Sequence, residues 1–292
     1  MPNHPDELLL KQVEDILIKQ RGYISRKPEE NEPVIFLATG GLDSTIIQYI
    51  ILKEWKVKIY PLFIKRGAKA SEYEEISFDF FCEFFSKEFP GKYINPLKIN
   101  VEIPPKQIKE NFSKLDLIRQ GYPMRNSILE SLGVSYAVSL KLKNDIDIKE
   151  IYTGIISDDF SFKPNRILSL YMMTLLSGVN TGNWNLSVTS PVLDKYLDVS
   201  RFHTKVDIIK YAIKHKIPLE KTRSCTNGSE MPDGDCCQCI TRQYAFIKAG
   251  IKDPLNYTKK LSENEIIKLK NSFLEIEKKN LSGESEEYLR NY

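Results

Sequence analysis

Residues 34–45 read VIFLATGGLDST, and this stretch decides the fold. Its first five residues form an unbroken apolar run, which is expected of a strand buried on both faces of a parallel sheet. Two glycines follow, and after them Ile46, Ile47, Ile50 and Ile51 recur on one side of a helical pattern. A strand, a glycine turn and a helix in this order predict the opening unit of an α/β domain.

The remainder of the chain continues the alternation of strands and helices. Apolar runs that predict further strands lie at residues 57–64, 98–101, 151–155 and 186–192. Helical patterns between them lie near residues 126–142, 166–177 and 204–214. Ser71 is expected to cap another helix, because acidic residues follow it in the first turn. The alternation predicts an α/β fold with a Rossmann-like parallel sheet and helices on both of its faces.

The composition is that of a globular protein. Of the 292 residues 41% are hydrophobic, which is enough for a sizeable core, and 42 basic residues nearly balance 39 acidic ones. This balance gives no indication of a nucleic-acid or membrane partner. The beginning of the chain lacks the pattern of a secretory signal, and no apolar run is long enough to span a bilayer. A cytoplasmic location is therefore expected.

The turn at residues 39–45 has the composition of a phosphate-binding loop. Consecutive glycines allow positive φ angles and a close approach of the ligand, and the following helix adds the positive end of its dipole. The hydroxyls of Thr39, Ser44 and Thr45 are available at the same place. Neither a Walker A loop nor a G-x-G-x-x-G fingerprint is present. The alternative is a sharp turn without a ligand, and Asp43 together with the hydroxyls favours phosphate binding.

Four of the five cysteines lie close together near the C-terminal end, which indicates a metal site in a chain without an export signal. Cys236 and Cys239 have the C-x-x-C spacing that lets two thiolates reach one ion, and Cys225 supplies a third. The fourth ligand of a tetrahedral zinc is then Asp233 or Cys237, and Asp233 is preferred because adjacent cysteine side chains diverge. The alternatives are a loop of inert buried thiols and a thioredoxin-type motif.

The glycine turn resembles the SGGLDS motif of the PP-loop ATP pyrophosphatases, with Thr39 in place of the first serine. The resemblance implies an adenine nucleotide alpha hydrolase-like fold. It also implies an enzyme that cleaves ATP between its α and β phosphates. The products implied are AMP, pyrophosphate and an adenylated substrate. The residues that the resemblance implies for binding ATP and Mg²⁺ are Thr39, Gly40, Gly41, Leu42, Asp43, Ser44 and Thr45.

Further segments, in motif order over residues 33–253, resemble the 7-cyano-7-deazaguanine synthase family. They lie at 122–126 (P-G-R-N in the family), 154–161 (G-x-N-x-x-D-Y-S), 204–209 (T-K-x-x-I-I) and 225–242, where the family has its zinc-binding cysteines and an arginine. By this resemblance the chain adenylates 7-carboxy-7-deazaguanine with ATP, and ammonia then leads to an amide and a nitrile. The cofactors implied are ATP, Mg²⁺ and Zn²⁺.

The same resemblance assigns roles to individual residues of this chain. The implied catalytic residues are Asp43, Arg125 and Lys205. The implied substrate-binding residues are Arg125, Asn126, Asp159, Phe160, Ser161 and Asn165. The implied zinc ligands are Cys225, Asp233, Cys236 and Cys239.

The sequence departs from the family pattern where the base would bind and at the cysteines. Asn165 stands in place of an acidic residue, and Asp233 stands in place of a cysteine. Lys65 and Arg66 bring positive charge near the nucleotide, or they are simply solvated. These departures keep two alternatives open: a diverged antiphage-defence member that joins the activated deazaguanine to a protein amine, and a non-catalytic nucleotide-binding scaffold. A homodimer is among the oligomeric states that the sequence allows.

Four segments are expected along the chain. They are an N-terminal helical extension and linker at 1–32, the PP-loop ATP-binding α/β domain at 33–222, a zinc-binding loop and helix at 223–253, and a C-terminal helical extension at 254–292. The N-terminal helix carries Val13 and Leu17 on one side and is expected to pack on the edge of the domain. Ser262 and Glu265 have the spacing of a capping box at the start of the last helix.

Overall fold

A computed structural model describes residues 5–112, 122–159 and 166–282 of the chain. These residues contain a five-stranded sheet in the order β3-β2-β1-β4-β5, and every neighbouring pair is parallel. The strands are β1 (Pro33–Ala38), β2 (Lys58–Lys65), β3 (Leu97–Asn100), β4 (Glu150–Tyr152) and β5 (Ser187–Thr189). Each strand lies in a stretch where the apolar runs predicted one, so the expected parallel α/β sheet is confirmed.

The strand order places a crevice between β1 and β4. The chain builds outward from β1 through β2 to β3, and it then returns to the other side of β1 to form β4 and β5. The loops that leave β1 and β4 at their carboxyl ends therefore run in opposite directions. In open parallel sheets the ligand binds in the crevice at such a switch point. We call this side of the sheet its carboxyl edge.

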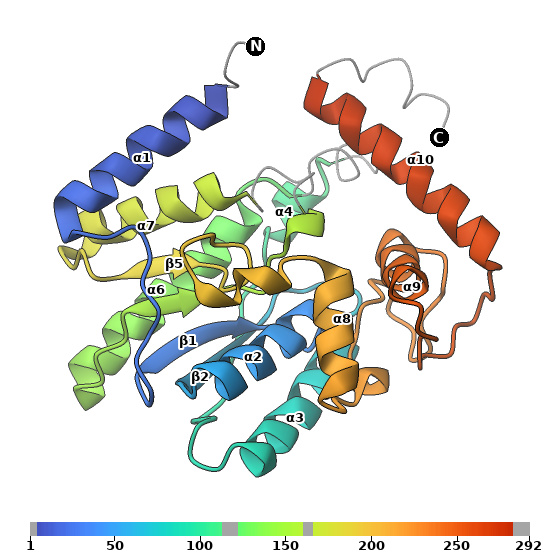
Figure 1. Ribbon diagram of the computed structural model, residues 1–292, viewed down its shortest axis with the longest axis horizontal. Coiled ribbons are helices and arrows are strands. Elements are labelled where there is room, and N and C mark those ends of the chain that lie inside the picture. The colour runs from blue at the N-terminus through green and yellow to red at the C-terminus, as the bar shows by residue number, and fades with distance from the viewer. Residues whose placement is uncertain (1–4, 113–121, 160–165, 283–292) are drawn as a thin grey trace.

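Helices cover both faces of the sheet (Figure 1). On one face lie α2 (Leu42–Glu54), α3 (Ser71–Glu88) and α8 (Lys205–Lys214), which pack on Phe36 and Phe63 of the sheet. On the other face lie α6 (Arg125–Asn144) and α7 (Ile167–Thr181), which pack on Ile35 and Leu37. Because side chains of a strand alternate between its faces, the unbroken apolar run of β1 serves both cores.

Three expectations about element ends are wrong in detail, and one of them is the run at 186–192, which ends as a strand at Thr189. The run at 151–155 ends as a strand at Tyr152. Gly154 lies against Ser44, in the turn that follows the neighbouring strand β1, and the backbone leaves the sheet there. Ser71 does not cap α3. The cap position is Ala70, which makes no side-chain cap, and the Ser71 hydroxyl accepts a hydrogen bond from the Ala68 N–H at 2.9 Å instead.

The N-terminal extension packs on the edge of the domain, as expected. Helix α1 (Pro5–Arg21) lies along α7, and its buried side chains Val13 and Leu17 contact the cluster that contains Tyr171. The segment after α1 was expected to be a polar linker, and ion pairs hold it against the domain. Arg26 pairs with Glu32 and lies 3.2 Å from the buried carboxylate of Glu150 at the start of β4.

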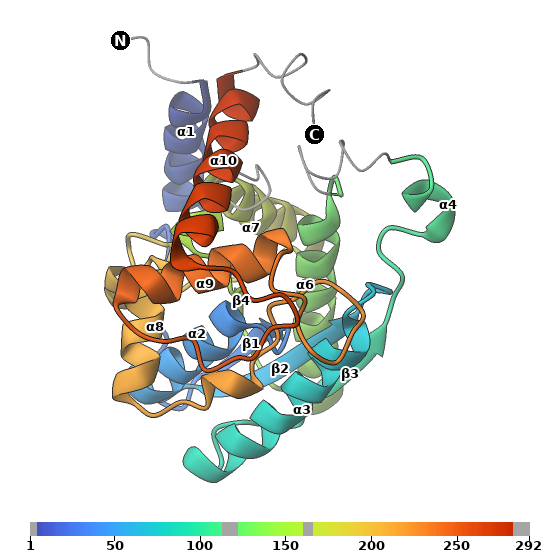
Figure 2. The ribbon, with the colours of Figure 1, turned by 90° about the vertical axis from the view of Figure 1, so that its right-hand side faces the viewer.

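The C-terminal part forms a helical unit beside the sheet (Figure 2). Helix α9 (Cys237–Ala249) packs on α8, and α10 (Glu263–Ser282) packs on α9. The predicted capping box is present, since Ser262 N–H donates to Glu265 at 2.8 Å and Glu265 N–H donates back to the Ser262 hydroxyl. Short helices are α4 (Lys106–Lys109), η1 (Ser157–Asp159), η3 (Asp198–Phe202) and η4 (Leu219–Lys221). Among the described helices, none combines the length and apolarity of a membrane span.

Candidate functional site

The glycine turn follows β1 at the carboxyl edge, and its shape requires glycine. Gly40 has a φ of 67°, and a Cβ on it would lie 2.5 Å from the carbonyl oxygen of Glu74 and 2.7 Å from the Phe78 nitrogen. A Cβ on Gly41 would lie 3.1 Å from the Thr39 hydroxyl. The turn is thus packed against the first turns of α3, and it can bend back only because no side chain is present at Gly40.

Hydroxyl groups hold the turn from within. The Thr39 N–H donates to the Ser44 hydroxyl at 3.0 Å, and the Gly41 N–H donates to the Thr39 hydroxyl at 3.2 Å. Ser44, Thr45 and Leu42 are buried, while Thr39 is exposed at the mouth of the turn. Of the three hydroxyls expected to face a ligand, Ser44 therefore has a structural role first, and Thr39 remains the one open to solvent.

Asp43 and Lys205 meet across the crevice. The Lys205 ammonium lies 2.5 Å from one carboxylate oxygen of Asp43, and the lysine side chain is 6% exposed. The other oxygen, Oδ1 of Asp43, is buried and has no hydrogen-bond partner among the described residues. A buried oxygen without a donor is unfavourable unless a cation or a donor arrives with a ligand. The pair therefore marks a place prepared for a charged ligand.

Helix α8 presents Lys205 from its first position. Thr204 caps the helix with a capping box formed with Asp207, and the Lys205 N–H donates to the carboxylate of Asp158. A lysine at a helix N-terminus is opposed by the helix dipole, so local structure does not explain it. The amino ends of α2 and α8 direct backbone N–H groups towards the crevice, an arrangement that suits phosphate groups.

The carboxyl ends of β4 and β5 close the crevice. A Cβ on Gly154 would lie 2.8 Å from the Cα of Ser44, so the loop after β4 touches the glycine turn. The Thr153 N–H donates to the Thr189 carbonyl, and the Ser190 hydroxyl donates to the Ile155 carbonyl. These bonds fix the three loops relative to one another.

The residues expected to bind the acid substrate are only partly described. Arg125 and Asn126 begin α6, which as the crossover from β3 to β4 starts at the carboxyl edge. Met124 before them has a φ of 59°, and Arg125 donates to the Asn126 side chain at 3.2 Å. Asp159 ends the short helix η1. Phe160, Ser161 and Asn165 lie outside the described residues.

The structure brings together the four residues predicted to hold zinc. The ligand atoms of Cys225, Asp233, Cys236 and Cys239 all lie within 4.8 Å of one another, and the sulfurs of Cys225 and Cys236 are 4.0 Å apart. Three thiols and one carboxylate at this spacing fit a tetrahedral zinc, whose sulfur ligands lie about 2.3 Å from the ion. Cys237 is exposed and is not in the group.

The pKa values of the cysteine thiols in this group favour the binding of a metal cation. A hydrogen bond with Cys239 lowers the pKa of Cys236 to about 6, and the same contact raises the pKa of Cys239. Cys236, at the N-cap of α9, is thus the cysteine of the group whose thiol loses its proton most readily. A metal ion would replace the remaining thiol protons.

Sequence reasoning missed Arg223, which shapes the loop around these cysteines, and it noted Arg242 only as the arginine of the family's cysteine pattern, without its partner. The guanidinium of Arg223 donates to the carbonyls of Asn227, Ser229 and Glu230, and it lies over the ring of Tyr73. The buried side chain of Arg242 pairs with Asp253 at 3.0 Å. Both arginines were visible in the sequence, but which carbonyls or carboxylates they bind depends on the tertiary fold.

The same loop is attached to the glycine turn. The Arg223 N–H donates to the Gly40 carbonyl at 2.9 Å, and the Ser77 hydroxyl lies 2.6 Å from that carbonyl and 2.7 Å from the Lys221 carbonyl. The cysteine loop and the turn are therefore neighbours, although more than 180 residues separate them in the chain.

Lys65 and Arg66 are not free cations. Lys65 pairs with Glu75 at 2.8 Å and Arg66 pairs with Glu74 at 3.2 Å, so the first turns of α3 neutralise them. These ion pairs argue against free positive charge at the nucleotide, and they show that the two side chains are paired rather than simply solvated.

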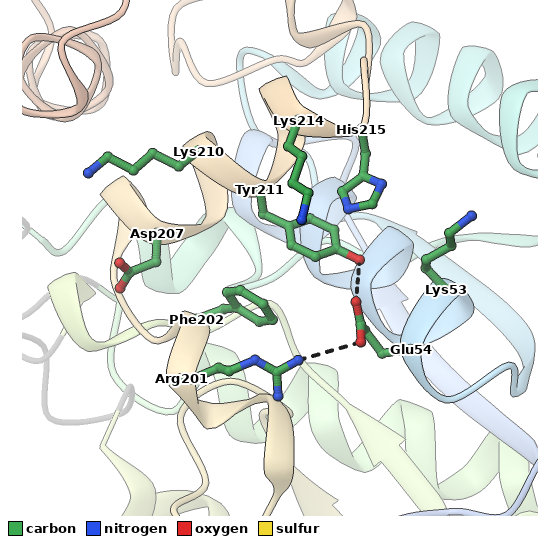
Figure 3. A pocket seen from close by; sticks show the side chains of 9 residues that line it. All are labelled: Lys53, Glu54, Arg201, Phe202, Asp207, Lys210, Tyr211, Lys214 and His215. Carbon is green, nitrogen blue, oxygen red and sulfur yellow. Dashed lines mark hydrogen bonds and ion pairs between the residues drawn. The ribbon is translucent and has the colours of Figure 1, made fainter.

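A separate hollow lies along α8, between that helix and the carboxyl end of α2. It has a volume of about 750 Å³, and Tyr211 and Arg201 at its wall both bind Glu54 (Figure 3). Its lining includes exposed lysines but none of the residues of the glycine turn or the cysteine group. The hollow is therefore a separate site from the crevice at the glycine turn.

Comparisons with known proteins agree on one family. The model of the family described as "Queuosine biosynthesis protein QueC" matches residues 33–250. The 7-cyano-7-deazaguanine synthase of Thermoplasma acidophilum is 26% identical over 242 residues, which cover 79% of this chain and 94% of that protein. The enzyme of the same name from Archaeoglobus fulgidus is 27% identical and is covered to 88%, over 76% of this chain.

One solved structure is also similar. The U34-tRNA thiolase NcsA from Methanococcus maripaludis, with its 4Fe-4S cluster, is 11% identical with a TM-score of 0.38, over 94% of this chain and 81% of that one. This likeness is weak, and nothing about the chemistry of the chain follows from it.

Proposed function

The chain belongs to the family of the Queuosine biosynthesis protein QueC, and on that premise we propose that it is an ATP-dependent ligase that activates 7-carboxy-7-deazaguanine. The carboxylate of the acid attacks the α-phosphorus of ATP and displaces pyrophosphate. Ammonia then attacks the acyl carbon, AMP leaves, and an amide forms. A second ATP activates the amide oxygen, and loss of AMP with a proton gives the nitrile.

The observation that carries the proposal is the Asp43–Lys205 pair at the glycine turn. The unpartnered Oδ1 of Asp43 fits a ligand for Mg²⁺, which prefers carboxylate oxygens and phosphate oxygens together. The buried ammonium of Lys205 is suited to the negative charge that grows on the phosphates as the α–β bond breaks. Bound Mg²⁺ would neutralise phosphate charge, while Lys205 and the backbone N–H groups of the turn would orient the chain of phosphates.

No side chain of the protein needs to become covalently attached in this reaction. Its work is to hold the acid against the α-phosphate, to exclude water from the acyl adenylate and to supply fixed positive charge. Arg125, at the start of α6 on the carboxyl edge, is the second cation that we assign to this task. The cysteine group supports the proposal as the place for a structural zinc beside the turn.

Product analysis tests the proposal. The purified chain is incubated with ATP, Mg²⁺, ammonia and 7-carboxy-7-deazaguanine, and AMP, pyrophosphate and the base are followed by mass spectrometry. We expect AMP and pyrophosphate in equal amounts, release that depends on the acid, and the masses of the amide and the nitrile. ATP that stays intact, or that is cleaved equally without the acid, would contradict it.

The same assay addresses the alternative acceptor. Capture of the activated acid by a protein amine stays a prediction, and it would appear as a deazaguanine mass added to a protein when candidate acceptors replace ammonia. A scaffold without catalytic activity would release no pyrophosphate in either reaction.

A further inference from the structure

A buried carboxyl group lies on the sheet side of α6, in the half of the helix nearer the carboxyl edge. Glu130 is 1% exposed, and it stands one helical turn before Gly133. A Cβ on Gly133 would lie 2.8 Å from the Ile151 side chain, so this side of the helix faces the sheet. Because α6 begins at the carboxyl edge, Glu130 lies nearer to that edge than Gly133 does.

This carboxyl group has no partner. Neither oxygen of Glu130 has a hydrogen bond among the described residues, and burial raises the pKa of the group to about 8. The elements packed against α6 bring no charge to it. Strand β1 has no titratable side chain, Tyr152 packs on the other face of the sheet, and Tyr171 of α7 donates to Asp194. A buried acid of this kind is unfavourable unless a ligand supplies donors.

The other titratable groups nearby are also accounted for. Glu150 stands at the amino end of β4, away from the crevice, and it has the guanidinium of Arg26 within 3.2 Å. Arg125, on α6 itself, precedes Glu130 by more than one turn. Arg166 stands at the N-cap of α7, which as the crossover from β4 to β5 also starts at the carboxyl edge. In the described part of the chain, burial is the cause that raises the pKa of Glu130.

A second unpartnered polar group lies on the same face. Thr153 is 6% exposed, and its hydroxyl has no partner among the described residues. Its backbone extends β4 by one residue through the hydrogen bond to Thr189, so its side chain returns to the face that Ile151 occupies and α6 covers. Its neighbour Gly154 touches Ser44 of the glycine turn. Thr153 thus adjoins the nucleotide crevice, and Glu130 lies on the same face of the sheet, towards its carboxyl edge.

Their chemistry defines what they can bind. A carboxylate accepts two parallel N–H donors, and a hydroxyl next to it can donate to a carbonyl oxygen. The edge of a 2-aminopyrimidin-4-one ring, as in a deazaguanine, presents an amino group, a ring N–H and a carbonyl oxygen in a row. We propose that Glu130 and Thr153 form the subsite that binds this edge of the base, an inference that rests on the proposed function.

Binding of the base then moves a proton. In the free protein Glu130 holds its proton at pH 7, and two N–H donors favour the ionised form. The proton leaves to solvent as the base binds, so affinity should rise with pH up to about 8, by at most tenfold for each pH unit.

Isothermal titration calorimetry measures this release. The probe is 7-carboxy-7-deazaguanine, added to the full chain with a non-hydrolysable ATP analogue at pH 7 in two buffers of different ionisation enthalpy. The wild type should release close to one proton for each acid bound. Glu130→Gln, which keeps the shape of the side chain, should release none and bind roughly tenfold or more weakly.

Glu150→Gln is the matched control, because Glu150 is equally buried and burial raises its pKa to about 7, but it lies at the other end of the sheet. It should leave affinity and proton release as in the wild type. An analogue without the 2-amino group adds a second readout. The wild type should bind it roughly tenfold or more weakly than the acid, and Glu130→Leu should not distinguish the two.

The outcomes separate the two proposals. If the wild type binds ATP but not the acid, both the subsite and the proposed substrate are wrong. If it binds the acid without releasing a proton, or if Glu130→Gln binds it equally well, the subsite alone is wrong and the ligase proposal stands. Thermal unfolding of each variant confirms that the comparison is made between folded proteins.

Discussion

The glycine turn and the cysteine loop lie against each other, but they are shaped by different forces. The turn is determined by excluded volume: a single methyl group on Gly40 would enter the backbone of α3. The loop is determined by side chains, with Arg223 binding its carbonyls and four ligand groups converging at its base. A backbone shaped by sterics allows little variation in sequence, whereas a loop shaped by ligand groups can combine different donors, here three thiols and the carboxylate of Asp233.

The first way to break the turn is chemical, and it should have the largest effect. Asp43→Ala removes the carboxylate opposite Lys205 and should lower acid-dependent pyrophosphate release by about 10³-fold or more. The fold should persist, because Asp43 is not part of the apolar core. Steady-state assays measure the loss. Lys210→Ala, on the exposed side of the same helix α8, is the control and should retain activity.

The second is steric. Gly40→Ala places a Cβ 2.5 Å from the Glu74 carbonyl and should lower the free energy of unfolding by about 4 kcal/mol. Gly91→Ala is the matched control, because Gly91 has a φ of 71° and open space around it. It should cost only about 1 kcal/mol, the conformational part alone. Chemical denaturation compares the two, and equal losses would show that the turn is less crowded than the structure indicates.

The cysteine loop should respond to its ion. We expect about one zinc for each chain, and Cys225→Ser should lose it together with about 3 kcal/mol of stability. Elemental analysis and thermal unfolding follow both quantities. Cys237→Ser, which alters a cysteine outside the group, should keep the metal. A chain purified without chelators that contains no metal would contradict the assignment.

Substitution of Glu130 should give the smallest of these effects. It tests a buried group under the sheet, which belongs to neither the turn nor the cysteine loop. A carboxyl group whose pKa is raised in the folded state binds its proton more tightly there, so its contribution to stability is present below pH 4.5 and is lost as pH rises towards 8. Between pH 5 and pH 7 the wild type should lose about 2 kcal/mol relative to Glu130→Gln, since one proton is worth at most about 1.4 kcal/mol per pH unit. Denaturation at several pH values measures the difference in slope.

The sequence could predict what depends on local pattern. The apolar run of β1, the two glycines and the C-x-x-C spacing are local patterns, and the structure has the strand, the turn and the cysteine group at those positions. What it could not predict depends on partners far away in the chain. Glu130 falls within an ordinary helical pattern, and only the packing of α6 on β4 shows that the carboxyl group is buried without a partner. The early ends of β4 and β5 likewise follow from contacts between loops.

The hydrogen bond from Arg223 to the Gly40 carbonyl has a thermodynamic consequence. It joins a loop that a metal would order to a turn that a nucleotide would order. The two ligand sites are therefore connected through one hydrogen bond. Free energies of coupling between binding sites are reciprocal. Whatever factor zinc contributes to the affinity for ATP, ATP must contribute to the affinity for zinc, so nucleotide in the buffer should shift the chelator concentration that removes half of the metal at equilibrium.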